Sequence, residues 1–254
     1  FKSWELDTLS KRIISWIANS NSFYHEGDEN FKTNFTKILK KQLNHLTNEI
    51  ENTEFVNDKM IGCSAIIMGG LCFKHQMHYL NIGFQLLKNI INTIFDNDGF
   101  PKSRNPRQII FYLKYFVFIR ELLKDSNTDI PEYLNEIIFY LGQSFDFYFE
   151  ESDCTFLFNG NHDLHITGFK KYLKEHGYKF KNKLNSLGGY SIIRNKKDKI
   201  IVDFGPTPEK RYSADYQSGA LSFEIFHEKE KLITNCGYFQ NYNHKLNILS
   251  KSTA

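Results

Sequence analysis

The sequence lacks several patterns that would identify a protein class at once. Its four cysteines, Cys63, Cys72, Cys154 and Cys236, form no CxxC pair, so they indicate neither a zinc site nor a dense disulfide framework. No stretch reaches the roughly 18 consecutive apolar residues of a membrane span. No GxGxxG or Walker pattern is present, so no glycine-rich phosphate loop is indicated. We therefore expect no cofactor and no membrane span in this chain.

The sequence also lacks a recognisable start and finish. It begins at Phe1 rather than at a methionine, and nothing near this residue resembles a signal peptide. It opens inside an amphipathic run and stops at the letters SKSTA, directly after strand-like sequence. We expect both ends to be cuts through a longer protein, so the missing signal does not indicate a compartment.

What is present is ample material for a packed core. Apolar residues make up 41% of the chain and aromatic residues 16%, including 24 Phe and 14 Tyr, which argues against disorder. The net charge of +3 is a small difference between 32 basic and 29 acidic residues. This weak bias is typical of many neutral enzymes, and we expect no nucleic-acid partner.

The first part of the chain has the periodicity of helices. Apolar residues recur every three or four positions across residues 28–51, behind Asp28 as a candidate N-cap. The lysines on the other side of this helix are typical of a solvated face. Residues 58–73 are apolar nearly all round, and Gly62 and Gly69 there favour close helix packing. Further helices are predicted at residues 10–19, 79–95, 106–123, 131–149 and 164–176.

After residue 187 the period changes from 3.6 to 2, which is the period of a half-buried strand. Strands are predicted at residues 190–194, 199–204, 220–226 and 231–235, with a hairpin turn at 195–198. The prediction is an α+β protein of two domains. Residues 1–187 form a helical domain of antiparallel hairpins, and residues 188–254 form the first strands of an antiparallel β-domain.

Several segments, taken in order, resemble the heparinase II/III family of polysaccharide lyases, in particular a bacterial subset with an Arg-Asn-Pro signature. These segments are RIISWIAN (12–19), DGFPKSRNP (98–106), FLFNG (156–160), SGALSFEI (218–225) and LITNCG (232–237). The final SKSTA is similar to the start of the family's Ser-Thr-Ala-His strand. The resemblance covers almost the whole chain, and it rests on the order and spacing of the segments.

The resemblance implies an incomplete α/α toroid of helical hairpins followed by the start of a β-sandwich, with a periplasmic or cell-envelope location. It implies a carbon–oxygen lyase that cleaves an acidic, uronic-acid-containing polysaccharide by β-elimination. In that reaction a base removes the proton beside the carboxylate, the charge of the carboxylate is neutralised, and the sugar linked at O4 departs.

Carried over to this sequence, the resemblance implies a carboxylate contact for Asn105 and a charge-assisted bond to an anionic sugar for Arg104. Asn105 also precedes Pro106, so it is equally a candidate N-cap of the next helix. The two roles are compatible, because anions favour helix N-termini.

The loop after FLF adds the candidate substrate-binding residues Asn159 and His162. The same segment reads equally well as an ordinary turn rich in Asn and Gly. His162 and His165 lie three residues apart, but without a third ligand at a suitable spacing we predict no metal there.

The catalytic candidates after the helical part are Tyr212, Tyr216 and Gln217. Tyr212 and Tyr216, together with Tyr148, are candidates for the proton-transferring tyrosine, and each also reads as a core or surface aromatic. Gln217 stands where many family members carry a histidine, and Gln cannot act as a base near neutral pH.

Two further departures accompany Gln217. Pro101 replaces a family histidine, and Asn235 replaces an aspartate of the family's sandwich metal site. The alternative hypothesis is therefore a non-catalytic protein that binds acidic glycans on the lyase scaffold. A hydrolase on a helical toroid is a third hypothesis, but no spacing singles out the two opposed carboxylates that it requires.

Overall fold

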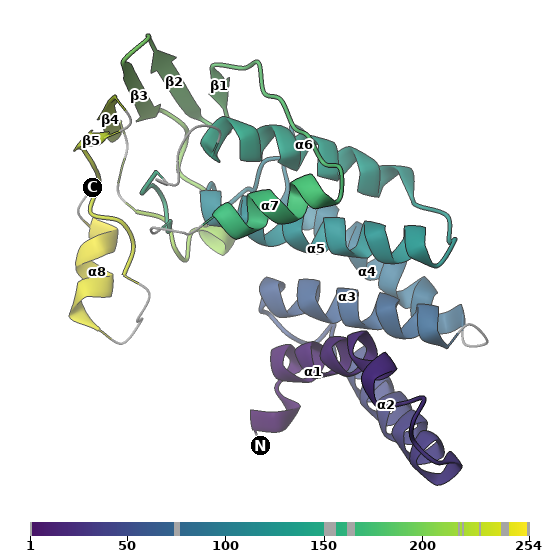
Figure 1. The fold of residues 1–254 in the computed structure, drawn as a ribbon. Coiled ribbons are helices and arrows are strands. Elements are labelled where there is room, and N and C mark those ends of the chain that lie inside the picture. The colour runs from purple at the N-terminus through teal and green to yellow at the C-terminus, as the bar shows by residue number, and fades with distance from the viewer. Residues whose placement is uncertain are drawn as a thin grey trace. The chain divides into compact units, whose positions relative to one another are not determined.

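The computed structural model describes residues 2–73, 77–149, 156–161, 166–217, 219, 221–228, 230–239 and 244–252 (Figure 1). Their α-helices are α1 (Leu6–Ala18), α2 (Glu29–Glu49), α3 (Val56–Cys72), α4 (Met77–Ile94), α5 (Pro106–Asp125), α6 (Glu132–Phe149), α7 (Thr167–Glu175) and α8 (Lys245–Ser252). Short 3-10 helices are η1 (Lys2–Trp4), η2 (Ser20–Ser22) and η3 (Lys210–Tyr212). The first seven α-helices match the seven predicted ones, with shifts at their ends.

Local chemistry explains where two of these helices begin and how closely a third packs. Asp28 caps α2, because its side chain accepts a hydrogen bond from the backbone N–H of Phe31 at 2.7 Å. Pro106 is the first residue of α5, where its missing N–H costs no helical bond. In α3, a side chain at Gly69 would overlap Leu43 of α2. The predicted close approach of these helices is confirmed.

The chain divides into two compact units. The first comprises residues 1–93 and 115–135, and the second comprises residues 94–114 and 136–254. The second unit contains the sheet and every motif discussed below, apart from RIISWIAN. The predicted domain boundary at 187/188 is a different division, and it stays a prediction.

The sheet is antiparallel, in the order β1 (Ser186–Leu187), β2 (Tyr190–Arg194), β3 (Asp198–Asp203), β4 (Phe223–His227) and β5 (Glu230–Ile233) (Figure 1). The predicted turn at 195–198 is confirmed, since the N–H of Asn195 donates to the carbonyl of Asp198 at 2.9 Å. β1 was not predicted. β4 begins later than residue 220, because Leu221 has φ of +62°, which is incompatible with a strand.

The register gives the sheet two different faces. Ile193 pairs with Ile200, which pairs with Ile225, which pairs with Ile233, so these residues share one face. That face is apolar and partly exposed, with Ile193 63% and Ile233 46% exposed. The opposite face is buried and carries Tyr190, Ile192, Ile201, Asp203, Glu224 and Phe226. Two carboxylates therefore lie inside the second unit.

The C-terminal segment corrects one prediction. The sequence directly before SKSTA was interpreted as strand-like, but Lys245–Ser252 form helix α8, and Ser250–Ser252 are its last turn. The Gln217 amide donates a hydrogen bond to the Ser250 carbonyl, which has no helical partner so close to the helix end. This tertiary contact, remote in sequence, favours the helix. Thr253 and Ala254 lie outside the described residues. No helix in the described part of the chain combines the length and apolarity needed to cross a membrane.

Candidate functional site

The Ser-Arg-Asn-Pro segment sits at the start of α5 in a fixed conformation. The Asn105 carboxamide oxygen accepts a hydrogen bond from the Arg107 N–H at 3.0 Å, so Asn105 is the helix cap. Its amide nitrogen donates to none of the described residues. Arg104 has φ of +57°, a left-handed conformation that is costly for a residue with a side chain. This backbone turn directs Arg104 into the interior while Asn105 caps the helix.

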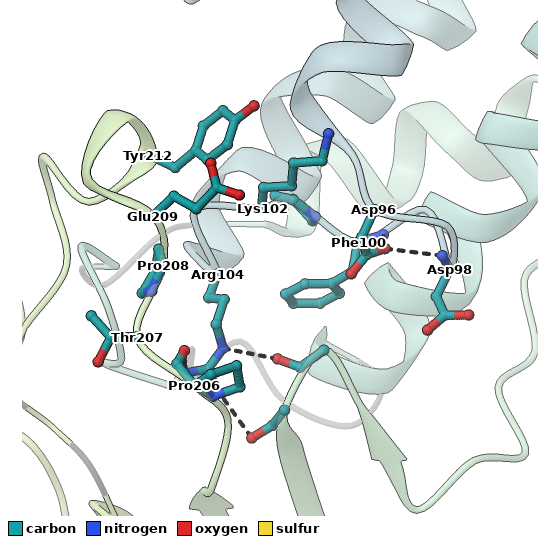
Figure 2. Close-up of a pocket in the computed structure, with 13 residues that line it drawn as sticks. Asp96, Asp98, Phe100, Lys102, Arg104, Pro206, Thr207, Pro208, Glu209 and Tyr212 are labelled. Carbon is teal, nitrogen blue, oxygen red and sulfur yellow. Dashed lines mark hydrogen bonds between the residues drawn. The ribbon is translucent and has the colours of Figure 1, made fainter.

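The Arg104 guanidinium holds three segments together. Its Nε donates to the Gly188 carbonyl at 3.1 Å, and its Nη1 donates to the Pro206 carbonyl at 3.1 Å (Figure 2). Its Nη2 donates to the Gly189 carbonyl and to the Asp203 carboxylate. A side chain at Gly189 would overlap the guanidinium. Four of its five N–H groups are therefore committed within the protein.

Arg104 belongs to a closed ring of buried polar groups. The other Asp203 oxygen accepts from the Asn159 amide at 2.8 Å, and the same amide donates to the Tyr190 hydroxyl. That hydroxyl donates in turn to the Arg104 carbonyl at 2.8 Å. Burial raises the pKa of Tyr190, so its phenol stays protonated. Each group has a partner, which is the condition under which buried polar groups stabilise a fold.

A second junction forms around Gly160, directly after Asn159. Its N–H donates to the Gln217 carboxamide oxygen at 3.2 Å, and a side chain there would overlap Asn105 and Asp215. Gly160 has φ of +86°, which only glycine adopts readily. Arg104, Asn105, Asn159 and Gln217 were predicted as site residues from three separate segments, and the fold brings them to this one region.

Beside Arg104 lies a cavity of about 330 Å³ (Figure 2). Its walls come from the loop before α5, the Gly188–Gly189 turn and the loop after β3. Figure 2 shows Lys102, Glu209 and Tyr212 together at one end, and the Lys102 ammonium lies 5.8 Å from the centre of the Tyr212 ring. Its size is that of a small-ligand site, and its lining carries both cationic groups (Lys102 and Arg104) and carboxylates (Asp96, Asp98 and Glu209).

The three candidate tyrosines have different environments. Tyr212 is half-buried and lines the cavity. Tyr216 is half-buried and lies outside its lining. Tyr148 is 1% exposed, and burial raises its pKa well above the usual value. Of the three, only Tyr212 meets the cavity. His162 lies outside the described residues, and its role stays a prediction.

Sequence reasoning missed the two buried carboxylates. Asp203 and Glu224 are both 0% exposed. One Glu224 oxygen accepts from the N–H of Leu157 and Asn235 and from the Thr234 hydroxyl, while the other oxygen has no partner. The available signal was strand register, since period 2 places Asp203 on the same face as Ile201.

The surroundings of Asn235 bear on the metal site that the family resemblance implies. Its backbone N–H and the Thr234 hydroxyl both point hydrogen atoms at Glu224, which is a donor set rather than a ligand set. Among the described residues no three His, Cys, Asp or Glu side chains gather closely enough to hold an ion. These residues do not fit a divalent metal.

Residues 182–254 match the family described as Heparinase II/III-like, C-terminal. The part of the chain from residue 182 onward is thus heparinase II/III-like. The match covers the sheet, the Gly188–Gly189 turn, Asp203 and Gln217. A comparison with curated proteins finds no significant match.

The fold of the chain is similar to that of several solved structures. A heparinase III crystal structure aligns with 99% of the chain at 15% identity, with a TM-score of 0.76. A heparinase III gene product with methylated lysines aligns with 98% at 15% identity, with a TM-score of 0.79. The heparan sulfate lyase HepC from Pedobacter heparinus aligns with 98% at 14% identity, with a TM-score of 0.76.

The described helices and the five-stranded antiparallel sheet thus match part of the heparinase III fold. The chain covers 46%, 42% and 43% of these three structures, so it spans less than half of their length. At these identities the likeness shows the fold and leaves the activity open.

Proposed function

We propose that this chain is part of a polysaccharide lyase-like protein that cleaves an acidic, uronic-acid-containing glycan by β-elimination. The observation that carries the proposal is the likeness to heparinase III and heparan sulfate lyase structures over nearly the whole chain. The cavity beside Arg104 gives weaker support, because Lys102 supplies a positive charge for an anionic sugar whereas Asp96, Asp98 and Glu209 also line it.

The proposal includes an architecture finer than the matched fold. Residues 1–187 form an incomplete α/α toroid, and residues 188–254 begin a β-sandwich. The exposed apolar face of the sheet supports the sandwich, because the inner face of a sandwich sheet is apolar and is covered by a second sheet.

In the proposed reaction, Asn105 and Arg104 meet the substrate carboxylate. The Asn105 carboxamide oxygen is occupied by the helix cap, which leaves its N–H groups as the proposed donors to the carboxylate. Asn105 is 2% exposed and lies outside the cavity lining, so this contact requires the surrounding loops to move. Arg104 has one N–H left after its four protein contacts. These donors stabilise the negative charge that develops as the adjacent proton leaves.

Tyr212 is the proposed proton-transferring group, since it lines the cavity beside Lys102. Tyr216 is the competing candidate. Asn159 and Gln217 act in this proposal by holding the loops that carry Asn105.

A second candidate function, non-catalytic binding of an acidic glycan, is favoured by the state of Gln217. Its oxygen accepts from Gly160, and its nitrogen donates to the carbonyls of Gly237 and Ser250. Both amide hydrogens are therefore used, and Gln217 is 3% exposed. It supplies the site with neither a base nor a free donor.

The test incubates the protein, in a form that includes the proposed second sheet, with uronic-acid-containing polysaccharides. Ultraviolet absorbance reports the unsaturated uronate that β-elimination produces. Tyr212→Phe should lower kcat by about 10²–10⁴-fold, the usual contribution of general acid–base catalysis, whereas Tyr216→Phe should leave kcat nearly unchanged. Glycan binding without absorbance would support the second candidate. New reducing ends without absorbance would contradict both proposals and indicate hydrolysis.

A further inference from the structure

The segment from α7 to β1 carries a concentrated positive charge. Residues 166–186 contain six lysines and a single acidic residue, Glu175, which is a net charge of +5. The whole chain has a net charge of only +3, so the remainder is slightly acidic. Such a local excess marks a surface for an anionic partner if the charges are fixed in place and unpaired.

Hydrogen bonds at the C-terminus of α7 fix the direction in which the chain leaves this helix. The N–H of Tyr178 donates to the Leu173 carbonyl at 2.9 Å, and the N–H of Gly177 donates to the Lys174 carbonyl at 3.1 Å. Gly177 has φ of +79°, which completes a Schellman ending. The chain therefore leaves the helix in one defined direction.

The residues that follow, which form neither helix nor strand, alternate between the protein and solvent. Phe180 packs on Gly142 of α6, where a side chain would overlap its ring. The N–H of Asn182 donates to the Asp146 carboxylate at 2.7 Å. Lys179, Lys181 and Lys183 are exposed. The residues between them, Phe180 and Asn182, contact the protein, so these three lysines form one row on the solvent side of the segment.

This lysine row (Lys179, Lys181 and Lys183) is unpaired. Within the residues that the structure describes, no carboxylate forms an ion pair with any of its three ammonium groups, whereas Lys171 on α7 pairs with Glu175 at 3.8 Å. The row therefore presents a positive charge at every second residue of the segment. None of the three lysines lines the cavity near Tyr212.

We propose that the lysine row binds an acidic polysaccharide chain outside the cavity and so holds a long substrate on the protein. A regularly charged, extended polyanion complements a row of flexible cations. The choice of polysaccharide rests on the proposed function. A single-stranded nucleic acid fits less well, because it needs exposed rings for its bases and Phe180 faces α6.

The test compares two triple variants for binding to immobilised heparan sulfate. Lys179→Gln/Lys181→Gln/Lys183→Gln should weaken binding about tenfold or more, and its affinity should depend less steeply on salt because fewer counterions are released. The control, Lys37→Gln/Lys41→Gln/Lys88→Gln, removes the same charge from exposed lysines of α2 and α4 and should bind like the unmodified protein. Equal affinities of the two variants would overturn the proposal.

A second measurement separates this proposal from the lyase proposal. Binding to heparan sulfate is measured without turnover, so loss of binding in the lysine-row variant supports the row even if no unsaturated product ever forms. If product does form, the variant should cleave a tetrasaccharide normally and the long polymer more slowly. Tighter binding of a single-stranded oligonucleotide than of heparan sulfate by the unmodified protein would overturn the choice of partner.

Discussion

At the scale of single residues, two buried carboxylates of the second unit differ in how protein donors satisfy their oxygens. Asp203 accepts from Arg104 and Asn159 on its two oxygens, so its charge is paired and both oxygens are hydrogen-bonded. Glu224 has three donors on one oxygen and none on the other. Burial raises the pKa of the Glu224 carboxyl above its usual value, because the charged form loses its hydration.

Glu224→Gln should therefore change how stability depends on pH. Because the folded-state pKa is raised, the folded protein holds a proton that the unfolded chain releases, and stability falls as pH rises from about 4.3 through the raised value. Gln keeps an acceptor for the three donors and cannot ionise. The variant should therefore gain stability relative to the unmodified protein as pH rises. In urea titrations, its free energy of unfolding minus that of the unmodified protein should be larger at pH 7 than at pH 4.

Neutralising Asp203 should change stability at pH 7 in the opposite direction from neutralising Glu224. Asp203→Asn leaves the Arg104 guanidinium buried without its carboxylate and should lower the free energy of unfolding by about 3–5 kcal/mol at pH 7. A pH-independent difference for Glu224→Gln, or a neutral Asp203→Asn, would contradict the roles assigned to these two carboxylates.

At the scale of elements, α7 shows how one residue type acts in opposite ways at the two ends of a helix. Gly168 lies in its first turn and Gly177 lies just beyond its C-terminus. A side chain at either position would meet no other atom within 4 Å. The two sites thus differ in backbone conformation, because Gly177 has a positive φ and Gly168 does not.

Alanine at these two positions should shift stability in opposite directions. Gly168→Ala should stabilise the protein by up to about 1 kcal/mol, since alanine loses less backbone entropy in a helix. Gly177→Ala should destabilise it by about 1–2 kcal/mol, because a left-handed residue with a Cβ is strained. Urea unfolding measures both values. Shifts of the same sign would show that local contacts outweigh backbone conformation here.

At the scale of the whole molecule, the described sheet has one apolar face that is partly exposed. Ile193, Phe223 and Ile233 are between 44% and 63% exposed on three different strands. Contiguous apolar surface of this kind marks an interaction site or an aggregation site. A second sheet, as proposed for the sandwich, would cover this face.

This chain on its own should therefore self-associate through that face. Ile193→Thr/Ile233→Thr should lower the weight-average mass seen by light scattering at high protein concentration, and should reduce the binding of an apolar dye. Ile38→Thr/Met77→Thr removes two comparably exposed apolar side chains from helices α2 and α4, and should change neither measurement. An equal effect of the two double variants would contradict a specific role for the sheet face.

The elements were largely predictable, whereas the contacts within the candidate site were not. Asp28 and Pro106 marked helix starts through their own chemistry, and strand β2 was predicted with its observed bounds. The strand-like interpretation of the sequence before SKSTA was wrong, because Lys245–Ser252 form helix α8, and the hydrogen bond from Gln217 to Ser250 joins that helix to a residue 33 positions away. No local pattern contains such a contact, and local preference is weak in so short a segment.

The sequence by itself determined the order of helices and strands, the alternation of the sheet faces and the family resemblance, because these depend on residue spacing within one segment. Only the tertiary structure decided that Arg104 binds Asp203, that Gly160 joins Asn105 to Gln217, and that Tyr212 meets the cavity. Each of these contacts joins residues more than 50 positions apart. Their partners are selected by burial, where a polar group must find whichever complementary group the packed chain brings within reach.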